Sequence, residues 1–174
     1  MRTITFGYRK EGLALHKWAY KNTDLQAIVL PDNRMEEPTT PKIREWADAK
    51  NVTMLVQTKL DFAKFVRMFK PDLILCHCYT YKLTEDILKI PRLGCINIHP
   101  GKLPDYAGRS PIEVALKNGD KKLWVTLHYM DEGFDTGKKI SECSVDRVDD
   151  LMVLRKQLTT AGLNLLSYYI RTLA

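Results

Sequence analysis

The chain has 174 residues, of which 45% are hydrophobic and 28% are charged, and its formal net charge is +6. These proportions are typical of an ordinary folded protein, and the length suffices for one domain with a substantial core. No apolar run approaches the roughly 20 residues of a membrane span. The apolar stretch after Met1 is short and predicts a buried strand rather than a signal peptide. We therefore expect a cytoplasmic protein with one domain over residues 1–174 and no membrane partner.

The basic residues lie in scattered pairs such as Lys121-Lys122 and form no stripe. This distribution disfavours a nucleic-acid partner, and it fits either a phosphate-bearing small molecule or a solvated surface. The cysteines at 76, 78, 95 and 143 lack the two-residue spacing of a zinc site. A strand would place Cys76 and Cys78 on one face and His77 on the other. We expect reduced, buried thiols and no metal site.

Apolar strand-like runs alternate along the chain with helical patterns, which predicts an α/β fold with a mostly parallel, Rossmann-like sheet flanked by helices. Strands are expected over 3–6, 27–30, 53–56, 73–78, 95–98, 123–129 and 138–144. Helices are expected over 11–20, 60–69 and 84–89, after Pro41, after Pro111 and from Asp150 onward.

Local signals place several helix ends. Ser110 and Glu113 flank Pro111 in the pattern of a capping box, and Asn118-Gly119 is a typical helix C-terminus. The closing helix carries an apolar stripe that should face the core. Its members are Leu151, Leu154, Leu158, Ala161, Leu165, Tyr169 and Leu173.

The strongest chemical signal is the strand that delivers Asn97 and His99 into a turn rich in Pro and Gly. Residues two apart in a strand point to the same face, so both side chains can address one reacting atom. A carboxylate in the glycine-bounded loop 130–137, either Asp131 or Asp135, would orient the imidazole. An amide donor, a titratable base and an orienting acid suit acyl transfer, because they can stabilise an oxyanion and move a proton.

The order of these motifs resembles the folate-dependent formyltransferase family. The matching elements are Asn97-Ile98-His99-Pro100, Leu103-Pro104, Tyr106, Gly108, Pro111, Asn118-Gly119-Asp120, Val125-Thr126-Leu127-His128 and Asp135-Thr136-Gly137. The resemblance implies 10-formyltetrahydrofolate as formyl donor, an amine as acceptor, and no metal. It implies catalytic roles for Asn97, His99 and Asp135, with Asp131 as the competing acid.

By the same resemblance, Asn97 and protonated His99 would donate to the oxyanion formed when the amine attacks, and Asp135 would raise the pKa of His99. The folate is expected near residues that could equally be ordinary core. These are Cys76, His77, Cys78, Tyr79, Asp131 and Gly133, with Tyr81 close by.

The turn after the first strand, residues 7–12, bears on the acceptor. It has bulky charged residues where glycinamide ribonucleotide enzymes have a glycine-rich phosphate loop, and it lacks the Pro-Asp/Glu-Phe motif of methionyl-tRNA enzymes. The string Gly108-Arg109-Ser110-Pro111 is similar to that of sugar N-formyltransferases, and we expect no C-terminal accessory domain. We therefore predict a dTDP- or UDP-linked 4-amino sugar as acceptor, bound by Tyr8, Arg9, Lys10, Lys102 and Arg109.

Three alternatives stay open. The acceptor could be glycinamide ribonucleotide or methionyl-tRNA. The same residues could direct water at formyltetrahydrofolate, which would make the protein a hydrolase. A binding module that keeps the fold without catalysis is the third, and the intact set of Asn97, His99 and Asp135 disfavours it.

Overall fold

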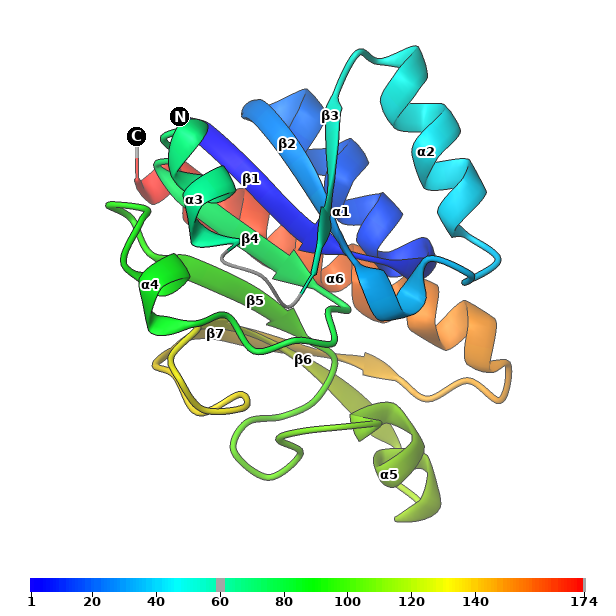
Figure 1. Cartoon of the computed structure of the whole chain (residues 1–174). Helices are drawn as coiled ribbons and strands as arrows, with labels where there is room; N and C mark the ends of the chain where they lie inside the picture. The colour runs from blue at the N-terminus through cyan, green and yellow to red at the C-terminus, as the bar shows by residue number, and fades with distance from the viewer. Residues whose placement is uncertain (59–61, 174) are drawn as a thin grey trace. The chain divides into compact units, whose positions relative to one another are not determined.

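The computed structural model describes residues 1–58 and 62–173, which form two compact units, Met1–Ile96 and Asn97–Ala174. Strands and helices alternate along both units (Figure 1). The α/β class predicted from the sequence is confirmed, and the strand pairs are mostly parallel.

The first unit holds a parallel sheet. β1 (Arg2–Gly7) pairs with β2 (Asp24–Pro31) on one side and with β4 (Leu73–His77) on the other, and β3 (Thr53–Gln57) pairs with β2. Every residue of β4 is buried, as expected for a central parallel strand. The helical segments of this unit are α1 (Arg9–Asn22), η1 (Asp32–Arg34), α2 (Thr40–Ala49), α3 (Ala63–Met68) and α4 (Glu85–Leu88).

The second unit begins within β5 (Cys95–His99) and is completed by a hairpin and two helices. β6 (Lys122–Tyr129) pairs antiparallel with β7 (Lys139–Asp146). α5 (Pro111–Lys117) precedes the hairpin, and α6 (Leu151–Thr172) follows it and packs on both of its strands. A Cβ atom on Gly162 of α6 would lie 2.3 Å from Ile98 Cγ2, so only glycine allows the helix this close to β5.

α6 begins where the sequence predicts a helix, and Asp150 caps its N-terminus, because Asp150 Oδ1 accepts hydrogen bonds from the amides of Met152 and Val153. The buried face is only partly the predicted one. Leu154 and Leu158 are buried, but the face then continues through Gly162 and Leu166, whereas Leu151 is 38% exposed. After Leu158 the predicted stripe continues with Ala161 and Leu165. The observed buried face instead continues four residues on, at Gly162, which is the glycine that lies against Ile98.

The predicted capping box at α5 is wrong. Ser110 has a φ of 57°, in the left-handed region, and its side chain makes no capping hydrogen bond. Glu113 instead pairs with Arg155 of α6. Gly119 does end the helix, with a φ of 78° that suits glycine.

Two further expectations concern α3 and the cysteines. Of the helix expected over 60–69, α3 covers Ala63–Met68, and Leu60 lies outside the described residues. Phe65, expected on the buried face, is 51% exposed. All four cysteines are free thiols, but only Cys76 and Cys95 are buried as expected, whereas Cys78 and Cys143 are partly exposed. In the described ranges, no cluster of three or more His, Cys, Asp or Glu side chains is arranged to hold a metal, and no helix has the length and apolar character to cross a bilayer.

His16 of α1 gives the fold a pH dependence. Its Nδ1 lies 2.7 Å from Thr5 Oγ1, its Nε2 lies 3.2 Å from the Gly7 carbonyl, and burial lowers its pKa from 6.5 to about 4. Since the unfolded chain binds the proton more readily, the stability gained from neutral His16 is complete above pH 6.5 and is lost as the pH falls toward 4. The total loss should be about 3 kcal/mol. In urea unfolding, the free energy of unfolding of His16→Gln, whose new side chain cannot titrate, should fall less steeply with decreasing pH than that of wild type. Equal slopes for the two proteins would contradict the assignment.

Candidate active site

The end of β5 and the loop after β6 bring three predicted side chains together within the second unit. His99 Nδ1 lies 3.3 Å from Asp135 Oδ2, and Asn97 Nδ2 donates to Asp135 Oδ1 at 3.3 Å. Asn97 and His99 meet the same carboxylate because they are two residues apart in a strand. Asp131 does not join them, because its Oδ1 accepts from the Gly133 amide and the Thr136 hydroxyl and so shapes its own loop.

The carboxylate of Asp135 is the centre of this cluster. Its backbone is in the left-handed region, with a φ of 58°, and the Gly108 amide donates to Oδ2 at 2.9 Å. Burial by itself would raise the pKa of Asp135, but the hydrogen bonds and charges of His128, His99 and Gly108 hold it below its usual value. Asp135 is therefore a carboxylate that faces two imidazoles.

His99 is 4% exposed, and both of its ring nitrogens face oxygen acceptors. Nδ1 faces Asp135, and Nε2 lies 2.7 Å from the Tyr106 carbonyl. Burial lowers the pKa of His99 below its usual value, although Asp135 and Tyr106 pull it upward. Asp135 thus acts in the predicted direction, but the predicted net rise is wrong because burial outweighs it. The ring is suited to taking up a proton, which would come to lie between Nδ1 and Oδ2.

The amide of Asn97 lies between two polar side chains. Nδ2 makes two contacts, one with Asp135 Oδ1 and one, at 3.1 Å, with His128 Nε2. An amide group has two N–H donors, and one of them donates to Asp135. The direction of the contact with His128 depends on the tautomer of that ring, and the expected donation from Asn97 to an oxyanion stays a prediction.

Residues that the sequence motifs contained, but to which no role was assigned, hold the cluster in place. The Tyr106 hydroxyl donates to Asp120 at 2.5 Å, which positions the carbonyl that faces His99. Thr126 donates to the Gly101 carbonyl at 2.7 Å and accepts from the Leu103 amide at 3.3 Å. The sequence pattern that could have identified Thr126 and His128 as site residues is the strand alternation in β6, which places both on one face.

The predicted acceptor-binding turn lies in the first unit. Tyr8 is 5% exposed, and its ring centroid lies 5.2 Å from the guanidinium of Arg9 and 5.6 Å from that of Arg34. Glu37 Oε1 lies 3.4 Å from the Arg9 guanidinium and 3.8 Å from that of Arg34. Lys10 is exposed. The sequence reasoning missed Arg34, which is distant in the chain from the turn.

The predicted folate-lining residues of the first unit are largely engaged in its core. Cys76 and His77 are buried, and burial raises the pKa of the Cys76 thiol. The Cys78 carbonyl accepts from the Tyr8 amide at 3.1 Å. The Tyr79 hydroxyl donates to Gln57 at 2.6 Å, and that of Tyr81 donates to Asp32.

The two remaining predicted basic residues belong to the second unit and differ in their surroundings. Lys102 Nζ lies 5.3 Å from the Trp124 ring centroid and 3.9 Å from Asp105 Oδ2, so it is held locally. Arg109 is exposed and directly follows Gly108, whose amide contacts Asp135.

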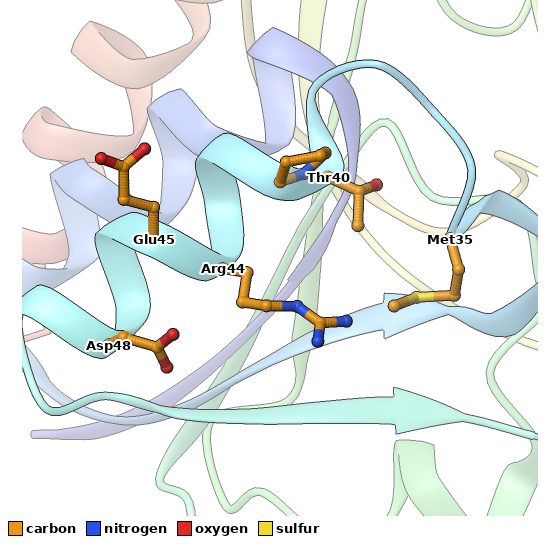
Figure 2. Close-up of a pocket in the computed structure, with 6 residues that line it drawn as sticks. Met35, Thr40, Arg44, Glu45 and Asp48 are labelled. Atoms are coloured by element: carbon orange, nitrogen blue, oxygen red, sulfur yellow. The ribbon is translucent and has the colours of Figure 1, made fainter.

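A shallow pocket of the first unit contains none of the predicted residues. In Figure 2 the guanidinium group of Arg44 extends from α2 toward the side chain of Met35. The pocket is lined by Met35, Thr40, Pro41, Arg44, Glu45 and Asp48. This set holds no cysteine, lysine or imidazole, and we place no reaction there.

Comparisons with known proteins agree with this geometry. Residues 30–170 match the family model described as formyl transferase. The methionyl-tRNA formyltransferase of Caldanaerobacter subterraneus subsp. tengcongensis is 34% identical over 159 residues, which are 86% of this chain and 51% of that protein. The chain spans about half the length, or less, of the curated relatives it matches.

Solved structures share the fold. Phosphoribosylglycinamide formyltransferase from Streptococcus pneumoniae TIGR4 has a TM-score of 0.80 at 20% identity, covering 99% of this chain and 98% of that one. A sugar N-formyltransferase from Shewanella sp FDAARGOS_354 has a TM-score of 0.71 at 16% identity, covering 98% and 68%. At these identities the likeness shows the fold alone.

Proposed function

Because the chain belongs to the formyl transferase family, we propose that it transfers a formyl group from 10-formyltetrahydrofolate to the amine of a dTDP- or UDP-linked 4-amino sugar. The observation that carries this proposal is the contact of His99 Nδ1 with Asp135 Oδ2, 3.3 Å apart, in which the imidazole is buried and the carboxylate side chain is 16% exposed. Acyl transfer to an amine releases a proton, and a buried imidazole with a lowered pKa beside a carboxylate can receive it.

The chain's residues account for the proton balance. As the amine nitrogen bonds to the formyl carbon, the carbonyl π electrons move to oxygen, and the pair of His99 and Asp135 takes the amine proton. When the oxyanion collapses, the bond from carbon to folate N10 breaks, and the pair returns the proton to N10. Tetrahydrofolate and the formylated amine are the products. No covalent enzyme intermediate is needed.

The amino-sugar acceptor is supported by the basic side chains. Arg9 and Arg34 share one carboxylate, Glu37, and so retain a net positive charge beside Tyr8, as a nucleotide diphosphate requires. Arg109 adds an exposed guanidinium one residue after Gly108, whose amide donates to Asp135. Lys10 and Lys102 stay predicted acceptor contacts on weaker grounds.

Methionyl-tRNA is the second candidate acceptor, because the curated relatives at 32–38% identity are methionyl-tRNA formyltransferases. With that acceptor, nucleic acid would be a partner. Folate contacts by Cys76, His77, Cys78, Tyr79, Asp131 and Gly133 stay predictions. So do a cytoplasmic location and a single catalytic domain over residues 1–174.

A panel of acceptors tests this choice. The 174-residue protein is incubated with 10-formyltetrahydrofolate and, separately, with dTDP- and UDP-4-amino sugars, glycinamide ribonucleotide and methionyl-tRNA. Turnover of an amino-sugar nucleotide is expected. Turnover of methionyl-tRNA with none of any amino sugar would contradict the sugar acceptor and leave the chemistry intact.

Arg109→Ala should raise KM for the sugar nucleotide by about 10-fold or more and leave kcat nearly unchanged. A charge-assisted contact to phosphate is worth about 1.5–3 kcal/mol, and it stabilises the ground state and the transition state alike. Arg171→Ala, which removes an exposed arginine from the last turn of α6, is the control and should change neither constant. A fall in kcat at unchanged KM would contradict the role of Arg109.

A further inference from the structure

His16 is a buried histidine of α1 that contacts the turn after β1. It is 0% exposed, its Nδ1 lies 2.7 Å from Thr5 Oγ1, and its Nε2 lies 3.2 Å from the Gly7 carbonyl oxygen. A carbonyl oxygen can only accept a hydrogen bond, whereas a hydroxyl group can donate or accept. Because burial lowers the pKa of His16 to about 4, the ring is neutral at pH 7. Only the neutral ring with its hydrogen on Nε2 satisfies both contacts, so it donates to Gly7 and accepts from Thr5.

The same turn is fixed at other points of its backbone. The Tyr8 amide donates to the Cys78 carbonyl at 3.1 Å, and the Gly12 amide donates to the Tyr8 carbonyl at 3.0 Å. A Cβ atom on Gly7 would lie 2.8 Å from Gly12 Cα, so the two ends of the turn are in contact. His16 adds a side-chain contact to the carbonyl that immediately precedes Tyr8. The orientation of the peptide between Gly7 and Tyr8 therefore depends on His16.

This peptide leads directly into the predicted acceptor contacts. Arg9 has a φ of 60°, a left-handed conformation that a residue other than glycine keeps only where its surroundings impose it. Its guanidinium lies 5.2 Å from the ring centroid of Tyr8 and shares the carboxylate of Glu37 with Arg34. A rotation of the peptide before Tyr8 would displace the tyrosine ring and the Arg9 guanidinium together.

We propose that His16 is a positioning residue that holds the turn after β1 in the conformation that binds the diphosphate of the acceptor. By fixing the Gly7 carbonyl, it places Tyr8 and Arg9 for that contact. The inference rests on the proposed function, because a nucleotide diphosphate is the group that the Arg9 guanidinium would bind. His16 is wholly buried, so it sets the affinity for the acceptor without touching it.

Two amide variants separate the two contacts of the ring. The side chain of His16→Gln reaches the position of Nε2 and can still donate to Gly7. That of the shorter His16→Asn reaches only the position of Nδ1, near Thr5. Calorimetric titration with UDP and with dTDP should give a Kd about 10-fold higher in His16→Asn and within about 2-fold of wild type in His16→Gln. A wild-type Kd in His16→Asn, or equal weakening in both variants, would overturn the proposal.

Thr3→Val is the control for a mere loss of stability. Thr3 and Thr5 lie on the same face of β1, and the buried Thr3 hydroxyl lies 2.6 Å from that of Thr23, at the end of the strand far from the turn. Urea unfolding should show a loss of stability in Thr3→Val and in His16→Asn, whereas only His16→Asn should bind the nucleotides more weakly. An equal rise of Kd in both variants would show that affinity follows stability, and would overturn the positioning role.

A measurement on the wild-type protein keeps the inference testable if His16→Asn does not fold. Long-range 1H–15N spectra distinguish protonated from unprotonated ring nitrogens, and His16 is expected to show a protonated Nε2 and an unprotonated Nδ1. A neutral ring protonated at Nδ1 would overturn the proposal, because the Gly7 carbonyl would then receive no hydrogen bond from it.

The binding experiment also separates this inference from the proposed function. A wild-type protein that binds neither UDP nor dTDP would overturn the sugar-nucleotide acceptor and the positioning role together. Binding by wild type with no difference between His16→Asn and His16→Gln would overturn the role of His16 alone and leave the proposed acceptor standing.

Discussion

Asp135→Asn is expected to lower kcat by about 10²- to 10³-fold, within the range that positioned proton transfer contributes to catalysis. Asp131→Asn should stay within a few-fold of wild type. Asp135 Oδ2 lies 3.3 Å from His99 Nδ1, whereas Asp131 Oδ1 accepts from the Gly133 amide and the Thr136 hydroxyl of its own loop. Asn tolerates the left-handed backbone at 135, so the substitution removes the charge without straining the turn.

An independent measurement checks the cause of this loss. The negative charge of Asp135 raises the pKa of His99 against the effect of burial. Titration of the His99 ring by NMR should therefore give a lower pKa in Asp135→Asn than in wild type, and an unchanged pKa in Asp131→Asn. Equal losses of activity in the two variants, or the reverse order, would make Asp131 the catalytic acid.

Gly101→Ala should lower kcat by about 10²-fold and the free energy of unfolding by about 1–3 kcal/mol. An added Cβ would lie 2.9 Å from His99 Nε2, 2.8 Å from Pro111 Cβ and 3.0 Å from Tyr106 Cβ. The ring would be pushed from the Tyr106 carbonyl, which it now meets at 2.7 Å. The variant should therefore lose activity even under conditions where it is fully folded.

Gly119→Ala is the matched control. An added Cβ at Gly119 meets no atom within 4 Å, but its φ of 78° makes any other residue strained. It should lose about 1–2 kcal/mol of stability and keep wild-type kcat. Urea unfolding and steady-state rates measure both quantities. Similar kcat values for Gly101→Ala and wild type would show that the turn does not position His99.

The sequence predicted those features that depend on local pattern. The strands were found because short apolar or alternating runs of four to seven residues are typical of strands. Asn97 and His99 were found because strand alternation places them on one face. The resemblance to a known family favoured Asp135 over Asp131, and the structure pairs Asp135, not Asp131, with His99.

The features that were missed depend on contacts between distant segments. The net pKa direction of His99 required its burial to be known, and the Tyr106 carbonyl that faces it leaves no trace in residue type. The Asn97 amide contacts His128, which is 31 residues away in the chain. The capping box failed because Glu113 pairs with Arg155, a partner that local pattern cannot reveal.

Following the labelled formyl group tests the central claim most directly. 10-Formyltetrahydrofolate carrying ¹³C in its formyl group is mixed with the wild-type protein, with and without an amino-sugar nucleotide, and the products are followed by NMR. We expect the label to appear as a formamide of the sugar amine, with tetrahydrofolate released in equal amount. Label that stays on the folate with every acceptor of the panel, or that appears as free formate whether or not an amine is present, would contradict a formyltransferase.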